Sequence, residues 1–114
     1  MFSQSQLENI LFLDIETASV VASYEELPER MQGLWDKKAG KYQRTEADRE
    51  KAPSQIFGEK AGIHAEFAKV VCISCGFLRF EGANASLRLK SFYGADEGMI
   101  LREFREMLDP FLKG

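Results

Sequence analysis

Apolar residues gather in three stretches that are typical of β-strands. Residues 10 to 13 are four consecutive apolar positions, which predicts a central strand buried on both faces. Residues 68 to 80 are rich in β-branched and aromatic residues, and residues 86 to 92 alternate apolar with polar side chains as in a half-exposed strand. The polar segment 81 to 85 joins these last two stretches, so we expect a hairpin, with Gly76 as a bend or bulge.

An apolar period near 3.6 residues predicts a helix over residues 96 to 112. Asp96 is a good N-cap for this helix, and Pro110 marks the expected end of its regular turns. The stripe that we expect to face the core consists of Ile100, Leu101, Phe104, Met107, Leu108 and Phe111.

A long insertion, about residues 18 to 67, separates the first strand from the hairpin, and its pattern is mostly helical. Pro28 fits the first turn of a helix, and a second short helix is predicted over residues 55 to 61. The polar segment 39 to 54 between them offers little to bury, so we expect it to be mobile. The apolar side of the first helix is predicted to consist of Leu27, Met31, Leu34 and Trp35.

The composition is that of one globular domain, with 114 residues of which 45% are hydrophobic and 29% charged. The formal charge of -3 provides no global positive field, so a phosphate-bearing substrate must be held locally, by a few side chains or by metal ions. The sequence has no membrane-length apolar run, no signal-peptide pattern over residues 1 to 8, and only two cysteines. We therefore expect a cytoplasmic protein without membrane contact.

Two acidic residues stand where the first strand loses its apolar character. Asp14 and Glu16 are two positions apart, so their carboxylates project from the same face of a strand. Like charges at that distance repel each other unless a cation lies between them, and carboxylate oxygens are preferred ligands of Mg²⁺ and Mn²⁺. The arrangement predicts a metal site, although strand-end acids are also often ordinary solvated residues.

The run from Phe12 to Thr17, Phe-Leu-Asp-Ile-Glu-Thr, resembles the first motif of the DEDD 3′-5′ exonucleases of the ribonuclease H-like fold. The likeness is to the branch related to the proofreading domain of family-B DNA polymerases. It continues through the segment 66 to 77 and through Phe92-Tyr93-Gly94 with the acidic helix start that follows, and so covers essentially the whole chain. The fold class that it implies is α/β, a ribonuclease H-like mixed sheet truncated to three strands and one helix, with a helical insertion between the first two strands.

The resemblance also implies an activity, namely hydrolysis of nucleic-acid phosphodiesters from the 3′ end by two-metal catalysis with Mg²⁺ or Mn²⁺. Asp14 and Glu16 would be metal ligands and catalytic residues, and Thr17 would help to seat the last nucleotide. The expected partner is a nucleic acid with a free 3′ end, with DNA favoured. Family members need two further acidic residues and a Tyr or His in later motifs, which residues 1 to 114 do not contain.

We therefore expect the chain to be the N-terminal part, residues 1 to 114, of a single exonuclease-like domain that is inactive as it stands, because members of a catalytic set act as a unit. The edge of the first strand would then be apolar and unprotected, which predicts a homodimer or swapped assembly through that edge. The alternative reading is a catalytically silent interaction module that has no metal site. A phosphotransferase that uses a strand-end Asp as nucleophile is a weaker third option, because its usual partner residues do not appear.

The remaining candidate residues are predicted to have packing or surface roles rather than chemical ones. Cys72 and Cys75 lie in an apolar strand and, three positions apart, point to opposite faces, which argues against redox or zinc chemistry. His64 is predicted to be a surface or packing histidine and Trp35 a core residue. A basic run with Tyr42 at its centre is compatible with nucleic-acid contact but favours a solvated surface, and its cations are Lys37, Lys38, Lys41 and Arg44.

Overall fold

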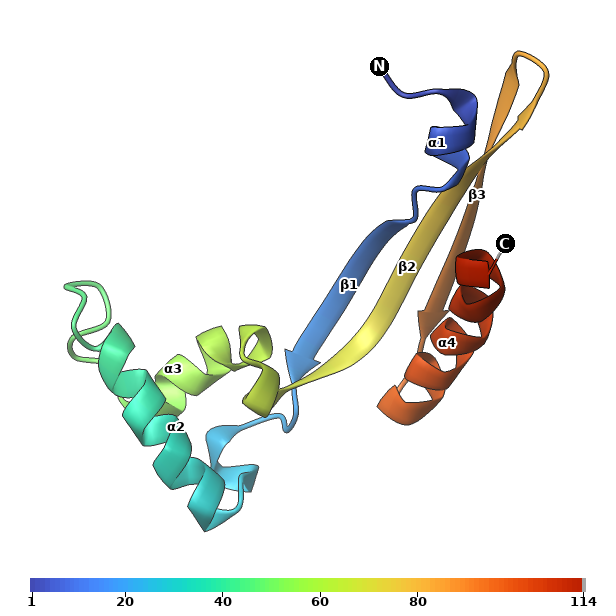
Figure 1. Ribbon diagram of the computed structural model, residues 1–114. Helices are drawn as coiled ribbons and strands as arrows, with labels where there is room; N and C mark the ends of the chain where they lie inside the picture. The colour runs from blue at the N-terminus through green and yellow to red at the C-terminus, as the bar shows by residue number, and fades with distance from the viewer. Residues whose placement is uncertain (114) are drawn as a thin grey trace. The chain divides into compact units, whose positions relative to one another are not determined.

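The computed structural model describes residues 1 to 113, and their contacts divide the chain into two compact units. Unit 1 combines Met1–Glu16 with the segment from Val70 onwards, and unit 2 is the continuous segment Thr17–Lys69. Unit 2 covers the region that the sequence pattern assigns to the insertion. The class is α/β: a three-stranded antiparallel sheet with several helices (Figure 1).

The sheet has the strand order β1-β2-β3, where β1 is Phe12–Ser19, β2 is Ala68–Glu81 and β3 is Asn84–Tyr93. The predicted hairpin is confirmed, because β2 and β3 pair antiparallel without interruption from Cys72 opposite Tyr93 to Glu81 opposite Asn84. Its tight turn contains Gly82 at a φ of 64°, a conformation that glycine adopts without steric cost. All strand neighbours are antiparallel, so the parallel pairing of a mixed sheet does not occur among residues 1 to 113.

The prediction of a bulge at Gly76 is wrong. Gly76 lies directly opposite Leu89 in an unbroken register. A Cβ atom at position 76 would lie 2.7 Å from Leu89 Cδ2, so the missing side chain lets Leu89 lie across the sheet. Gly76 therefore allows the Leu89 side chain to approach the backbone of β2 closely, and it does not bulge the strand.

The prediction that the first strand is central and buried on both faces is also wrong. β1 is an edge strand of the sheet, and Phe12, Leu13 and Ile15 are each about half exposed. An apolar run shows only that a strand is suited to burial on both faces. Within residues 1 to 113 one helix covers one face of this sheet, so the other face stays open.

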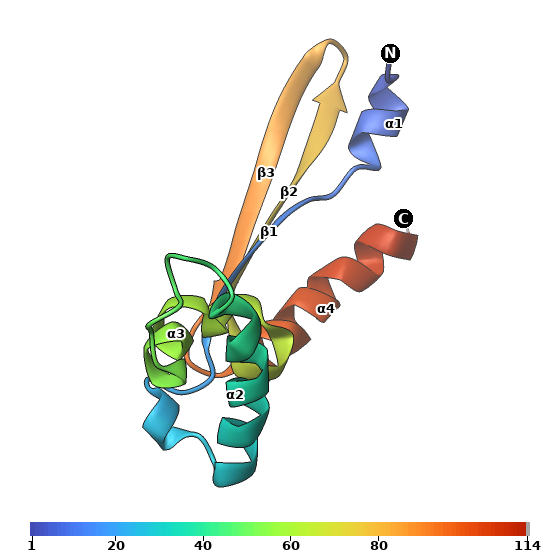
Figure 2. The ribbon, with the colours of Figure 1, turned by 90° about the vertical axis from the view of Figure 1, so that its left-hand side faces the viewer.

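That helix is α4, Glu97–Lys113, which lies along one face of the sheet in unit 1 (Figure 2). Its start agrees with the prediction, because Asp96 Oδ1 accepts a hydrogen bond from the Met99 N–H at 3.2 Å. The predicted range, residues 96 to 112, agrees with the observed helix, but the expectation that Pro110 ends the regular turns is wrong, because the helix continues past it. A proline in the last turn removes only one intrahelical hydrogen bond there. The core beneath α4 consists of Ile73, Cys75, Phe92 and Ile100, with Leu11, Val70, Phe104 and Met107 packed against it.

A short N-terminal helix, α1 (Gln4–Glu8), was not predicted. It begins with a capping box in which Ser3 and Gln6 exchange hydrogen bonds between side chain and backbone. The Glu8 carboxylate accepts a hydrogen bond from the Phe80 N–H at 3.2 Å, which attaches α1 to β2 within unit 1.

Unit 2 contains α2 (Glu29–Tyr42), α3 (Pro53–Lys60) and three short 3₁₀ turns (Figure 1). Both helices were predicted, but two details differ. Leu34, placed on the apolar side, is 45% exposed, and the segment expected to be mobile includes the last turn of α2, where Ala39 is fully buried. The core of unit 2 consists of Leu27, Trp35, Ala39, Ile56, Phe57, Ala61 and Phe67.

Candidate metal centre on the edge strand

Asp14 and Glu16 lie on β1 and are both exposed. Leu11 packs against the core beneath α4, so the alternation along the strand turns Leu13 and Ile15 towards that side. Asp14 and Glu16 therefore share the opposite, open face of the sheet, as their spacing predicts.

Neither carboxylate forms a salt bridge or a side-chain hydrogen bond among residues 1 to 113. The three salt bridges of this part of the chain all lie in unit 2. Two hard oxygen donors on one face, without a competing cation, fit a divalent ion of the Mg²⁺ type. They fit it only in part, because the described residues hold no cluster of three or more His, Cys, Asp and Glu side chains suited to a metal.

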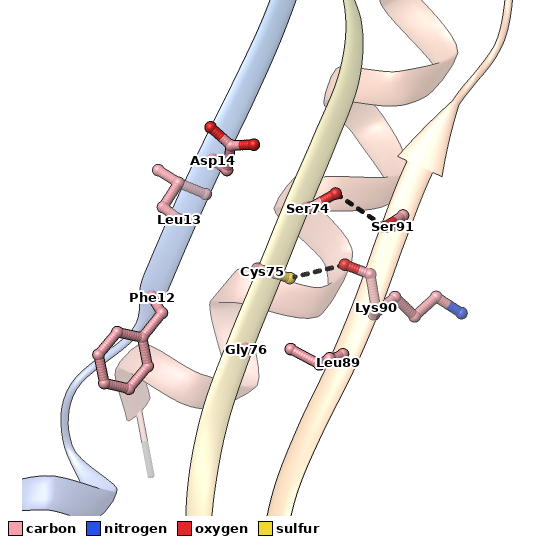
Figure 3. Close-up of a pocket in the computed structure, with 9 residues that line it drawn as sticks. All are labelled: Phe12, Leu13, Asp14, Ser74, Cys75, Gly76, Leu89, Lys90 and Ser91. Atoms are coloured by element: carbon pink, nitrogen blue, oxygen red, sulfur yellow. Dashed lines mark hydrogen bonds between the residues drawn. The ribbon is translucent and has the colours of Figure 1, made fainter.

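A groove of about 320 Å³ adjoins Asp14 on unit 1 (Figure 3). Its apolar wall is formed by Phe12 and Leu89, and Gly76 lies between β1 and β3 without a side chain to fill the space. Its polar part holds Ser74 and Ser91, whose hydroxyls are 2.8 Å apart. The remaining lining residues are Leu13, Cys75 and Lys90. The groove thus joins a carboxylate, two hydroxyls and an apolar surface.

Thr17 directly follows Glu16 in β1. Thr17 is the first residue of unit 2, and its hydroxyl donates a hydrogen bond to the Gly62 carbonyl oxygen in the 3₁₀ turn Ala61–Ile63 of the same unit. Its predicted role in seating a nucleotide stays a prediction.

His64 is a packing histidine, as predicted. Its Nε2 lies 2.6 Å from the Tyr42 hydroxyl, and its ring meets the Trp35 ring edge-on at 5.8 Å. Burial lowers the pKa of His64 below its ordinary value, and the nearby Lys38 ammonium acts in the same direction. The neutral imidazole is thus the form that this packed site favours.

The basic run of unit 2 does not offer a stacking surface. Tyr42 is half-buried and forms a hydrogen bond with His64, and Lys60 Nζ lies 5.8 Å from its ring centroid. Lys38 is paired with Glu66 at 3.4 Å. Trp35 is fully buried, and its Nε1 donates to the Pro53 carbonyl oxygen at 2.8 Å, which confirms its core role.

Cys72 and Cys75 are free thiols in β2. Cys75 belongs to the core beneath α4, whereas Cys72 lies within 3.7 Å of the Ser74 hydroxyl on the other face. Burial raises the pKa of the Cys75 thiol, which opposes thiolate chemistry. The placement agrees with the structural reading of the pair.

Sequence reasoning missed the groove residues Ser74, Gly76, Leu89 and Ser91. Each is unremarkable in the chain, and their juxtaposition depends on the register of β2 with β3. Predicting a two-residue turn at Gly82 and Ala83 would have given that register, since turn type and loop length set the pairing of a hairpin.

Comparison with known proteins gives no match: no family model, no curated protein and no solved structure is similar to this chain. Among residues 1 to 113, no helix has the length and apolar character that crossing a membrane requires.

Proposed function

We propose that this chain carries the first metal-binding motif of a metal-dependent 3′-5′ exonuclease with a ribonuclease H-like fold. One observation carries the proposal: Asp14 and Glu16 project from one face of an exposed edge strand and form no salt bridge among residues 1 to 113. The element order supports it, because a strand, a helical insertion, an antiparallel hairpin and a helix follow one another as the resemblance implies.

In this proposal Asp14 and Glu16 would hold Mg²⁺ or Mn²⁺, and Thr17 would help to position the terminal nucleotide of a DNA strand. Bound divalent ions supply an activated water and stabilise the charge of the leaving 3′ oxygen. The groove beside Asp14 offers space and two hydroxyls for a sugar or base. Since two carboxylates make only part of a ligand set, we expect weak metal binding and little hydrolysis by this chain alone.

The test is Mn²⁺ titration by calorimetry. We expect a dissociation constant on the order of millimolar for the unaltered chain, as for weak carboxylate sites. The double variant Asp14→Asn, Glu16→Gln keeps the side-chain shapes and should abolish the heat of binding. The matched control, Glu103→Gln with Glu106→Gln, removes the same charge from exposed positions of α4 and should change nothing. Equal loss in both double variants, or no binding by the unaltered chain, would overturn the proposal.

A second candidate function is a silent interaction module that forms a homodimer through β1. The observation in its favour is that β1 is an edge strand with half-exposed Phe12, Leu13 and Ile15. An unprotected apolar edge can pair with the same edge of a second copy. Light scattering after size exclusion should then show a dimer that Ile15→Lys disrupts and Leu34→Lys, on exposed α2 surface, does not. A monomer at every concentration would exclude this candidate.

A further inference from the structure

The hairpin of unit 1 carries a strip of three cations on the face that α4 covers in part. The register places Arg88 opposite Phe77 and Lys90 opposite Cys75, and Cys75 lies in the core beneath α4. Arg79, two positions after Phe77, belongs to the same face by strand alternation. All three cations are exposed.

Aromatic rings lie close to two of these cations, Lys90 and Arg79, and Arg79 also lines a hollow of unit 1 together with Glu8. Lys90 Nζ is 5.5 Å from the Phe92 ring centroid, and Arg79 Cζ is 5.6 Å from that of Phe77. Among residues 1 to 113 none of the three cations forms a salt bridge, and Glu81, at the turn, is the one acidic residue of β2 and β3. The strip is therefore a local positive surface on a chain of net negative charge.

A hollow of about 200 Å³ opens on this part of the hairpin. Phe77 and Met107 contribute apolar surface, and Arg88 and Lys90 place charge beside it. The other lining residues are Cys75 and Leu89. The α4 residues that pack towards the sheet near it, Phe104, Met107 and Phe111, are apolar, and no acidic residue lines this hollow.

We propose that this face of the hairpin binds single-stranded nucleic acid, with phosphates on Arg79, Arg88 and Lys90 and one base in the hollow beside Phe77. Proteins that bind single strands combine cations that follow the backbone with apolar or aromatic surfaces that receive unstacked bases. The surface deepens the proposed function, on which it rests for the choice of ligand, and it lies on the opposite face of the sheet from Asp14.

A single strand fits this surface better than a duplex. The bases of a duplex are stacked and paired, so placing one in a hollow costs unstacking energy that an unpaired strand does not pay. The net charge of -3 does not forbid binding, because charges more than about 10 Å apart are largely screened near 0.1 M salt. Three phosphate contacts on a single strand predict a slope of about -2 in log K against log salt, or roughly 20-fold weaker binding between about 50 and 200 mM salt.

The experiment is fluorescence anisotropy with a labelled DNA strand of about 12 nucleotides, within the site size of single-strand binders, in EDTA. The variant Arg79→Gln, Arg88→Gln, Lys90→Gln should lose at least about 10-fold in affinity and most of the salt slope. The control Lys37→Gln, Lys41→Gln, Arg44→Gln makes the same change in net charge on unit 2 and should bind within about 2-fold of the unaltered chain. Circular dichroism verifies that both variants are folded.

EDTA separates this proposal from the metal site. The Asp14→Asn, Glu16→Gln chain should bind the strand at least as well as the unaltered chain, whatever the calorimetry shows. No binding at low salt, or an equal loss of affinity in the two triple variants, would overturn the proposal that the cation strip binds a single strand. Equal affinity for inorganic polyphosphate of the same charge would also overturn it, because the hollow would then contribute nothing to binding.

Discussion

The core of unit 2 predicts a large contrast between two aliphatic truncations. Ile56 is fully buried on α3 beside Trp35, whereas Leu34 on α2 is 45% exposed. Replacing either residue with alanine removes three carbon atoms, worth about 0.8 kcal/mol each when fully buried. For Ile56 this gives about 2.4 kcal/mol, and the cavity left among close-packed rings raises the cost to about 3 kcal/mol.

Leu34→Ala should cost about 1 kcal/mol, since only about half of its transfer free energy is at stake and the site opens to solvent. Urea unfolding followed by fluorescence measures both costs, because Trp35 is the single tryptophan and lies in this core. With a slope near 1 to 3 kcal/mol/M, Ile56→Ala should lower the midpoint by roughly 1 M or more. Equal costs for the two variants, or less than about 1 kcal/mol for Ile56→Ala, would refute the packing of α3 against Trp35.

Three further predictions follow from single contacts. The pKa of His64 is lowered in the folded chain, so its contribution to stability is complete above the ordinary value of 6.5 and is lost as pH falls through the folded value. Urea midpoints at pH 7.5 and 5 should therefore differ less in His64→Asn than in the unaltered chain. Asp96→Ala removes the cap of the Met99 N–H and should cost about 1 kcal/mol by thermal unfolding, whereas Asp96→Ser should recover most of it. Burial and the raised pKa of Cys75 should make its alkylation at least about 10-fold slower in the folded chain than in urea, as mass spectrometry would show, and equal rates would contradict its place in the core.

Local pattern was sufficient for the hairpin, α4 and the two helices of unit 2, because each has a clear period and a recognisable start. It was not sufficient for β1. The apolar run before Asp14 indicates a strand that could be covered on both faces, but coverage depends on elements elsewhere in space. Helix α1 is so short that the capping pattern of Ser3 and Gln6 is its only sequence signal.

The candidate site divides in the same way. The two-residue spacing of Asp14 and Glu16 predicts their common face, because strand alternation is a local property. The groove beside them depends on Gly76 facing Leu89, which is a property of the hairpin register. Similarly, the cation strip brings together Arg79 and Arg88 from two strands, and no spacing along the chain shows that they are neighbours.

The order of the two units along the chain has a consequence for how the protein folds. Unit 2 is one continuous segment, Thr17–Lys69, whereas the sheet of unit 1 must join β1 to β2 across that whole segment. Closing a long flexible loop costs entropy that grows with the logarithm of its length. If α2 and α3 pack first, through contacts that are close in sequence, the open loop is replaced by a folded body. We therefore expect unit 2 to form early and the pairing of β1 with β2 to be the rate-limiting step of folding.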